Sequence, residues 1–269
     1  MSTDHTARWA LVTGASAGIG AAFARELAAR GCNLVLTARR RERLDELAAE
    51  LASRNAVRVE CVAADLADPQ APAQLCGEIA RRGIVIDTLV NNAGYGLPGH
   101  FHAQPWQAHV QFLQVMVNSP CELVHILLPA MQERAQGCII NVASLAGLIP
   151  GSSGHTLYGA SKAFLIKFSQ SLALENVRRG VKVCAVCPGF TYSEFHDVTG
   201  TRGVVSKMPN WMWLTAAEVA HQGIEAVERG EIVFVTGRVN RVIKSLVKLL
   251  PDRLALRMVQ KRSKNFRAQ

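Results

Sequence analysis

The stretch Thr13–Gly20, TGASAGIG, joins a short apolar run to a helical pattern and decides the fold class. The run before it, WALVTG (9–14), has the composition of a buried strand, and residues 18–30 form an amphipathic helical pattern that ends before Gly31. Gly14 permits a tight turn, and Gly20 lets the helix start close to the strand. The first thirty residues therefore predict a strand, a glycine turn and a helix packed against that strand.

The same alternation continues along the chain. Apolar β-branched runs are separated by longer helical stretches, which is typical of a parallel sheet with helices on both faces. Predicted strands are 9–14, 33–38, 57–63, 87–94, 137–144, 181–189 and 231–237. Predicted helices are 18–30, 40–54, 69–82, 105–134, 156–180 and 215–229. We expect an α/β Rossmann fold with a doubly wound, seven-stranded parallel sheet in one domain, residues 1–237, followed by a helical extension, 238–269.

Composition limits the class of protein. The 269 residues are 49% hydrophobic and 19% charged, as in a compact protein with a large core. The N-terminus lacks a basic segment followed by an apolar block, and no run of about 18 apolar residues suggests a membrane span. Seven scattered cysteines indicate reduced thiols, and Cys184 and Cys187 are interpreted as core residues of a strand. We expect a cytoplasmic protein without a metal site, because His100 and His102 have no Cys, Asp or Glu nearby.

Phosphate binding is the expected role of the glycine turn. Gly18 lets backbone N–H groups approach a pyrophosphate at the helix N-terminus. At the end of the second predicted strand, Thr37 and Ala38 supply no carboxylate for ribose hydroxyls, and Arg39 and Arg40 follow directly. Cations at this place suit a 2′-phosphate, so the sequence favours NADP over NAD. The alternative is that these arginines only solvate the start of a helix.

Several further motifs follow the glycine turn in a fixed order. They are DLAD (65–68), NNAG (91–94), Asn118, Ser144 in VASLAG, YGASK (158–162) and PG (188–189). The series resembles the short-chain dehydrogenase/reductase family over roughly residues 8–237. The resemblance implies that Asn118, Ser144, Tyr158 and Lys162 are catalytic. It implies cofactor contacts at Gly14, Ser16, Gly18, Ile19, Gly20, Arg39, Arg40, Asp65, Leu66, Asn91, Ala93, Gly94, Tyr158, Lys162, Pro188, Gly189, Thr191 and Ser193.

The YGASK motif carries the chemistry. A ketone that gains hydride develops alkoxide charge, so its oxygen needs a proton donor and an orienting group. Tyr158 is the natural donor, and Lys162, one helical turn on, is expected to lower its pKa. Within the resemblance, Ser144 orients the carbonyl and Asn118 carries a proton relay. Ser144 precedes Tyr158 by 14 residues, about one more than the family spacing, which leaves Ser152 or Ser153 as alternative orienting groups.

The expected substrate is apolar. Residues 190–214 are longer than an ordinary connection and rich in aromatic residues, which favours a lid over a ligand crevice; a packed surface loop is the alternative. Substrate contacts are expected at Ser144, Leu145, Tyr158, Phe190 and Trp211. This set lacks a cluster of cations for a carboxylate or phosphate, so we expect a hydrophobic ketone, aldehyde or secondary alcohol.

The basicity of the chain lies in its tail. The net charge is +9; residues 237–269 hold ten Lys and Arg against Asp252, and residues 1–236 hold 20 of each sign. Apolar residues recur in the tail at helical spacing, which leaves three interpretations: helices packed on the protein, peripheral membrane contact through 238–269, or contact with an acidic partner. The neutral body argues against nucleic acid.

Together, these features predict an NADP(H)-dependent oxidoreductase acting on a carbonyl or secondary alcohol. The family resemblance implies a homodimer or homotetramer. The alternative is a non-catalytic protein that binds NADPH or docks on membranes, and the intact Ser144, Tyr158 and Lys162 set argues against it.

Overall fold

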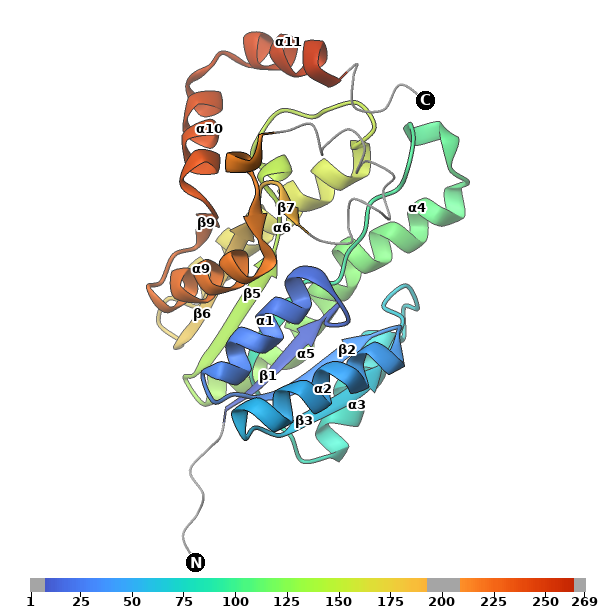
Figure 1. Cartoon of the computed structure of the whole chain (residues 1–269), viewed down its shortest axis with the longest axis vertical. Coiled ribbons are helices and arrows are strands. Elements are labelled where there is room, and N and C mark those ends of the chain that lie inside the picture. Colours follow the sequence, from blue (N-terminus) through green and yellow to red (C-terminus); the bar gives the residue numbers. More distant parts are fainter. Residues whose placement is uncertain (1–7, 193–208, 264–269) are drawn as a thin grey trace, which may run out of the picture.

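The computed structural model describes residues 8–192 and 209–263. Its centre is a parallel sheet in the order β3-β2-β1-β4-β5-β6-β9, which confirms the predicted fold class (Figure 1). The strands are β1 (Trp9–Thr13), β2 (Asn33–Ala38), β3 (Val59–Ala63), β4 (Ile86–Asn91), β5 (Gly137–Val142), β6 (Val181–Cys187) and β9 (Val233–Val235). The order reverses between β1 and β4, and such a reversal opens a crevice at the carboxyl ends of parallel strands.

Helices cover both faces of the sheet. On one face lie α1 (Gly18–Ala29), α2 (Arg41–Asn55) and α9 (Ala216–Glu228), whose buried Phe23, Leu44 and Ile224 share one core cluster. On the other face lie α3 (Ala71–Arg81), α5 (Ser119–Glu133) and α6 (Thr156–Glu175), with Leu75 and Leu123 in a second cluster. Two apolar faces explain why the strand segments are almost continuously hydrophobic.

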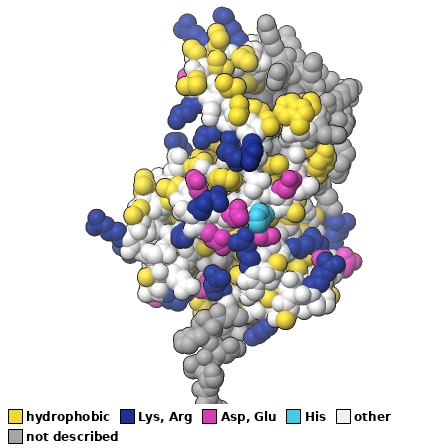
Figure 2. Space-filling model, turned by 60° about the vertical axis from the view of Figure 1, so that its left-hand side comes forward, with side chains coloured by type: hydrophobic (Ala, Val, Ile, Leu, Met, Phe, Trp, Pro, Cys, Tyr) yellow, Lys and Arg dark blue, Asp and Glu magenta, His cyan; other side chains and the backbone are white. Residues whose placement is uncertain are grey.

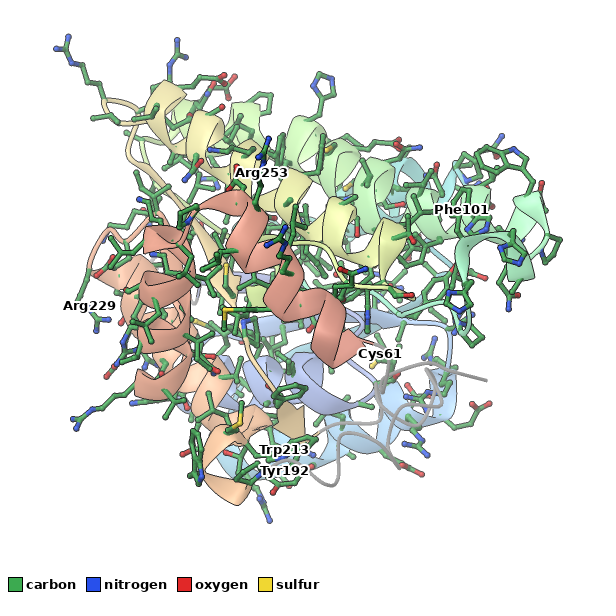
Figure 3. The ribbon with its side chains drawn as sticks, turned by 90° about the horizontal axis from the view of Figure 1, so that it is seen from above. Cys61, Phe101, Tyr192, Trp213, Arg229 and Arg253 are labelled. Atoms are coloured by element: carbon green, nitrogen blue, oxygen red, sulfur yellow. The ribbon has the colours of Figure 1, made fainter. Side chains whose placement is uncertain are left out.

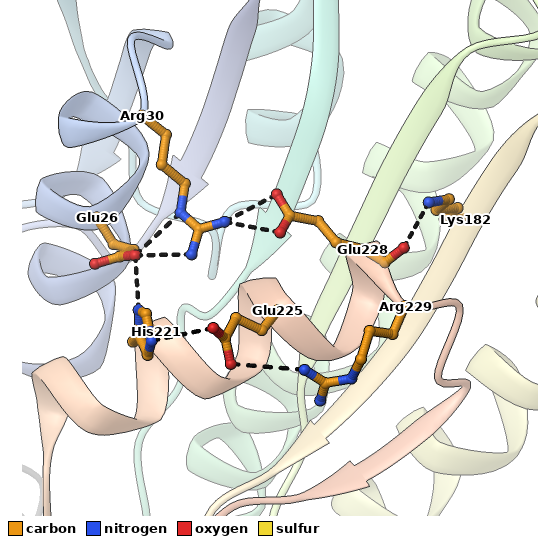
Figure 4. Close-up of polar contacts among 7 residues, drawn as sticks. All are labelled: Glu26, Arg30, Lys182, His221, Glu225, Glu228 and Arg229. Atoms are coloured by element: carbon orange, nitrogen blue, oxygen red, sulfur yellow. Dashed lines mark hydrogen bonds and ion pairs between the residues drawn. The ribbon is translucent and has the colours of Figure 1, made fainter.

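A polar network joins α1 to α9 at the surface (Figure 4). Arg30 contacts Glu26 at 2.9 Å and Glu228 at 2.8 Å, and His221 Nδ1 lies 3.0 Å from Glu26. Burial alone would raise the pKa of Glu26, but the hydrogen bonds from His221 and Arg30 outweigh it and lower the pKa. Exposed pairs of this kind contribute little stability, so the packing of α1 against α9 rests mainly on their apolar contacts.

The predicted helix 105–134 is divided. It consists of α4 (Trp106–Leu113), a single π-turn η2 (Gln114–Asn118) and α5. By length and composition alone Trp106–Glu133 could cross a membrane, but its residues Phe112, Leu123, Val124 and Met131 are buried in the protein, as in a core helix. A π-turn inserts one extra residue and often marks a functional site.

Short elements outside the main sheet also differ from the sequence-based expectation. β7 (Thr191–Tyr192) pairs in parallel with β8 (Leu214–Thr215), where no strands were predicted. Three further short helical turns are η1 (Phe101–Ala103), η3 (Leu145–Gly147) and η4 (Asn210–Met212). The helix predicted to continue to residue 180 ends at Glu175, and Cys184 and Cys187 are buried, free thiols of β6, as predicted.

The tail forms two helices, α10 (Arg238–Leu249) and α11 (Asp252–Ser263). They lie beyond the carboxyl end of β9, at the upper end of the molecule in the view of Figure 1. Viewed from above, α11 crosses over the top of the ribbon (Figure 3). We call α10 and α11 together the roof.

Candidate active site

A cavity of about 770 Å³ lies at the carboxyl ends of the strands. Its walls come from the glycine turn, the NNAG segment, the Ser144 segment, α6, the Pro188–Gly189 loop and the roof. Of the predicted cofactor residues, those on its wall are Gly14, Ser16, Gly18, Ile19, Arg39, Arg40, Asp65, Leu66, Ala93, Gly94, Tyr158, Lys162, Pro188, Gly189 and Thr191. Strands of separate βα units thus bring these residues to one edge of the sheet.

The glycine turn has the conformation that its sequence predicts. Gly14 and Gly18 have φ of 65° and 56°, in the left-handed region. A Cβ on Gly14 would lie 2.8 Å from Ala93 Cα, and one on Gly20 would overlap the Gly14 carbonyl oxygen. Gly20 is therefore a packing residue behind the turn rather than part of the cavity wall.

Thr13 fixes the turn against the NNAG segment. Its Oγ1 accepts from the N–H groups of Asn92 at 2.9 Å and Ala93 at 3.0 Å, and it donates to the Val90 carbonyl at 3.2 Å. Asn92 in turn donates through Nδ2 to the Thr13 carbonyl at 2.9 Å. The two segments that flank the strand-order reversal are thereby held together.

The N-terminus of α1 is prepared for an anion. Its N-cap residue Ala17 makes no side-chain cap, so the first N–H groups of the helix have no capping side chain. Ser16, Ala17, Gly18 and Ile19 line the cavity at this point. N–H groups without a capping side chain and the positive end of the helix dipole together fit a pyrophosphate.

Cations stand beside this anion site. Arg40 donates to Ser16 Oγ through Nε at 3.2 Å and Nη2 at 3.0 Å, and Arg39 is exposed at the cavity wall. Asp65 also lines the cavity, while its Oδ1 accepts from the Ala67 N–H at 3.1 Å, so it stabilises a turn as well. The residues present fit an NADP adenosine with a 2′-phosphate.

Asn91 does not line the cavity. It is buried in the core, where its Nδ2 donates to Asn141 Oδ1 at 2.9 Å and to the Pro120 carbonyl at 3.4 Å. Asn141 continues the chain to Ser169 Oγ at 2.8 Å. The structure therefore gives Asn91 a role in joining β4 to β5 and α5, not a place on the cavity wall.

Ser144 and Tyr158 meet at the cavity. Ser144 follows β5 and caps η3, accepting from the Ala146 N–H at 3.1 Å. Its side chain also hydrogen-bonds with Tyr158, which is the third residue of α6. Burial raises the pKa of Tyr158 above its ordinary value, and the Ser144 hydrogen bond opposes this rise. The additional residue between Ser144 and Tyr158 does not separate the pair, whereas Ser152 lies on the same wall bonded to His155.

Lys162 lies beneath this pair, 95% buried. Its Nζ donates to the Val142 carbonyl at 2.7 Å and stands 5.8 Å from the Tyr158 ring centroid. Burial lowers the pKa of Lys162 to about 8, and the nearby Cys187 acts in the opposite direction. The expectation that Lys162 lowers the pKa of Tyr158 is not met in this arrangement, because desolvation of the phenol dominates.

Asn118 lies behind the wall, in the π-turn packed beside α6. Its Nδ2 donates to Gln114 Oε1 at 2.9 Å, and Gln114 Nε2 donates to Ser119 Oγ at 3.3 Å. Ser119 Oγ then donates to the Leu66 carbonyl at 2.9 Å. This network fixes the π-turn, and Asn118 itself is not a cavity-lining residue.

Four of the five predicted substrate residues line the cavity, and one does not. Ser144, Leu145, Tyr158 and Phe190 line the cavity, but Trp211 is 66% exposed and its neighbour Met212 takes the place on the wall. Trp213 stacks on Tyr192 with ring centroids 4.6 Å apart (Figure 3). Ser193 and most of the predicted lid, 193–208, lie outside the described residues.

Sequence reasoning missed the contribution of the roof. Its cavity-lining residues are Asn240, Ile243, Val247, Leu250, Ala255, Met258 and Val259. The available signal was the spacing of Ile243, Val247 and Leu250, which places three apolar side chains on one helix face. The tail therefore supplies part of the cavity instead of standing apart from it.

Comparisons with known proteins agree with this geometry. A family profile described as "short chain dehydrogenase" matches residues 8–202. The very-long-chain 3-oxoacyl-CoA reductase of Anas platyrhynchos is 34% identical over 197 residues, which are 71% of this chain and 62% of that protein. The protein of the same name from Homo sapiens is 29% identical over 264 residues, 97% of this chain and 81% of that protein.

Solved structures share the architecture. A short-chain dehydrogenase from Sphingobium yanoikuyae in complex with NADPH is 32% identical, with a TM-score of 0.79 over 91% of this chain and 96% of that chain. The similarity extends beyond the glycine turn to nearly the whole described chain.

Proposed function

Since the chain belongs to the short-chain dehydrogenase/reductase family, and is thus an oxidoreductase, we propose that it is NADP(H)-dependent and acts on a hydrophobic carbonyl or secondary alcohol. The observation that carries the proposal is the meeting of Ser144, Tyr158 and buried Lys162 at one cavity wall, next to the uncapped glycine turn.

The cofactor preference is supported by charge. Arg39 and Arg40 stand where a 2′-phosphate would lie, and the described cavity wall has no carboxylate directly after β2 to repel it. The NADPH complex of the Sphingobium yanoikuyae relative is consistent with this choice. When bound, the nicotinamide of NADPH supplies the hydride for the carbonyl carbon.

The chain's own residues manage the proton and the orientation of the substrate. The Tyr158 hydroxyl donates its proton to the developing alkoxide oxygen, and the Ser144 hydroxyl holds that oxygen in position. The Lys162 ammonium stabilises the tyrosinate left behind; burial keeps the Tyr158 proton in place until that moment. Asn118, fixed by Gln114, is proposed to keep a proton path open behind Lys162.

The substrate class follows from the walls. Beyond Ser144 and Tyr158, the cavity is lined by Leu145, Ile149, Phe190 and Met212, and by the apolar face of the roof. Such a surface favours a hydrophobic ketone, aldehyde or secondary alcohol. The named oxoacyl substrates of the curated relatives also join a carbonyl to an apolar chain, although this chain spans only 62% of the Anas platyrhynchos protein.

Self-association is proposed through α5 and α6. Ile126 and Phe164 expose apolar side chains there, 37% and 42% exposed, and Phe164 stacks on Phe168. Burying such side chains against a second copy is a common basis of homodimers and homotetramers. The free thiols are consistent with a cytoplasmic location.

The test is NADPH and NADH oxidation measured against a panel of hydrophobic ketones and aldehydes. Turnover with NADPH, lost in Tyr158→Phe while NADPH binding is kept, is the expected result. A wild-type protein that binds NADPH but oxidises it with no carbonyl in the panel would favour the alternative of a non-catalytic NADPH-binding protein. A fully active Tyr158→Phe would instead exclude Tyr158 as the proton donor.

A further inference from the structure

The helix α10 carries more apolar surface than the protein covers. Ile243 and Val247 occupy one face and line the cavity, as does Leu250 directly after the helix end. Val242, Leu246 and Leu249 repeat the same spacing on the adjacent face, where they are 57%, 59% and 82% exposed. Together the two stripes form an apolar arc of a width that normally faces a core. The protein covers only the stripe that lines the cavity, so the exposed stripe has no partner among the described residues.

The helix α11 repeats this arrangement. Ala255 is buried, and Ala255 and Val259 line the cavity, whereas Leu254 and Leu256 are 49% and 52% exposed and do not line it. Met258 does both, since it lines the cavity and is 53% exposed. The roof therefore presents six exposed apolar side chains, while other residues of the same two helices line the cavity. Both helices lie at one end of the molecule (Figure 1).

Cations border the exposed apolar surface. Arg238, Lys244, Lys248, Arg253 and Arg257 make no ion pair among residues 8–192 and 209–263, and Asp252 is the single acidic residue of the roof. Figure 2 shows hydrophobic and cationic side chains mingled over the upper part of the molecule, while acidic side chains gather lower down. Unpaired cations around an apolar face match an anionic surface with an apolar interior.

A second copy of this chain fits the surface poorly. A two-fold contact through the roof would bring two strongly basic faces together, and like charges would oppose it. Self-association has another surface available on α5 and α6. The charge pattern thus favours a partner that is negative and apolar at once.

We propose that the roof docks on an anionic lipid bilayer, with Val242, Leu246, Leu249 and Leu254 entering the interface and the flanking cations contacting lipid phosphates. Because Ile243, Val247 and Val259 line the cavity from an adjacent face of the same helices, docking places the cavity next to the membrane. A hydrophobic substrate dissolved in the bilayer then reaches the cavity with little passage through water; this route, unlike the docking, rests on the proposed function.

Vesicle flotation tests the docking independently of turnover. The full-length protein is mixed with vesicles of phosphatidylcholine alone or with about 30% phosphatidylglycerol. We expect flotation with the anionic vesicles, weakened when salt rises from about 0.1 M to about 0.5 M. The double variant Leu246→Glu/Leu249→Glu places charges on the exposed stripe and leaves the cavity lining intact, so its partition should fall by about tenfold or more.

A matched control uses exposed apolar residues at the opposite end of the sheet. Leu174 and Val177 are 68% and 71% exposed, and Leu174→Glu/Val177→Glu should float like the wild type. Circular dichroism and NADPH binding verify that both variants are folded. Absence of wild-type flotation, or equal flotation of the roof variant, overturns the proposal. So does a wild-type dimer that becomes monomeric in the roof variant, because the roof would then be an interface between copies.

Discussion

Lys162→Met should stabilise the protein while it removes a proposed catalytic group. Lys162 is 95% buried and its Nζ donates to the Val142 carbonyl, and burial lowers its pKa from 10.5 to about 8. In the unfolded chain the amine keeps its ordinary pKa. Between these two values the unfolded state binds more protons than the folded state, so the free energy of unfolding rises with pH across this window.

The size of the effect follows from the two pKa values. Their difference corresponds to about 3 kcal/mol of cost to the folded state at pH 7, where the ammonium must be kept charged in a buried place. At about pH 9.5 the folded lysine is mostly neutral, so the cost of the buried amine to the folded state falls to about 1 kcal/mol. Methionine retains the apolar part of the side chain without the charge, and it gives up a hydrogen bond with a net contribution of about 1 kcal/mol.

Urea unfolding of both proteins at the two pH values measures this. At pH 7 we expect the free energy of unfolding of Lys162→Met to be about 2 kcal/mol higher than that of the wild type. At pH 9.5 this difference should be smaller by about 2 kcal/mol. Lys167→Met, on the exposed side of the same helix, should show neither effect. A gap that stays constant or widens with pH would refute the reasoning, since the buried charge would then not be its source.

Three other outcomes follow from particular contacts. Gly20→Ala should abolish NADPH binding or unfold the glycine turn, because its Cβ would overlap the Gly14 carbonyl, whereas Gly77→Ala, with open space in α3, should raise the free energy of unfolding by about 1 kcal/mol. Arg39→Ala should lower the ratio of kcat/KM for NADPH over NADH by about 10- to 100-fold, with Arg43→Ala as the control; an unchanged ratio would exclude Arg39 from the phosphate site. Thr215→Ala should lower stability in urea by about 1 kcal/mol, because it removes the Oγ1 that accepts from the Glu218 N–H at 3.1 Å in the capping box of α9.

The parallel sheet could be predicted because its strands are covered on both faces. Such strands need near-continuous apolar runs, and VKVCAVC (181–187) and NLVLTA (33–38) are hard to interpret as anything other than buried strands. The pair β7 and β8 could not be predicted in this way. Each strand has only two residues, and the pairing depends on a distant segment that brings Leu214 beside Thr191.

The π-turn at Asn118 was also beyond sequence reasoning. Residues 114–118 have ordinary helical composition, and the extra residue is accommodated through contacts of Gln114 and Ser119 that reach as far as the Leu66 carbonyl. Asn91 shows the opposite case, since a motif predicted a cavity residue and the structure places its amide between β4 and β5. A motif fixes which residues gather in one region, but not which of them face the cavity.

The orientation of the tail was undetermined for a similar reason. Its apolar arc is wide enough to face either a cavity or a membrane, and periodicity alone cannot say which half is covered. The contact that decides it is made by Asn240 with the backbone of Gly189. Asn240 is 2% exposed, and its Nδ2 donates to the Thr236 carbonyl at 2.9 Å. Its amide packs against Gly189 so closely that any Cβ on Gly189 would overlap it. Gly189 belongs to the loop that lines the cavity beside Lys162, so α10 is seated on that loop itself. The roof is therefore positioned by the same backbone that borders the proposed catalytic residues, so the proposed docking of α10 on a membrane would act directly on the cavity wall.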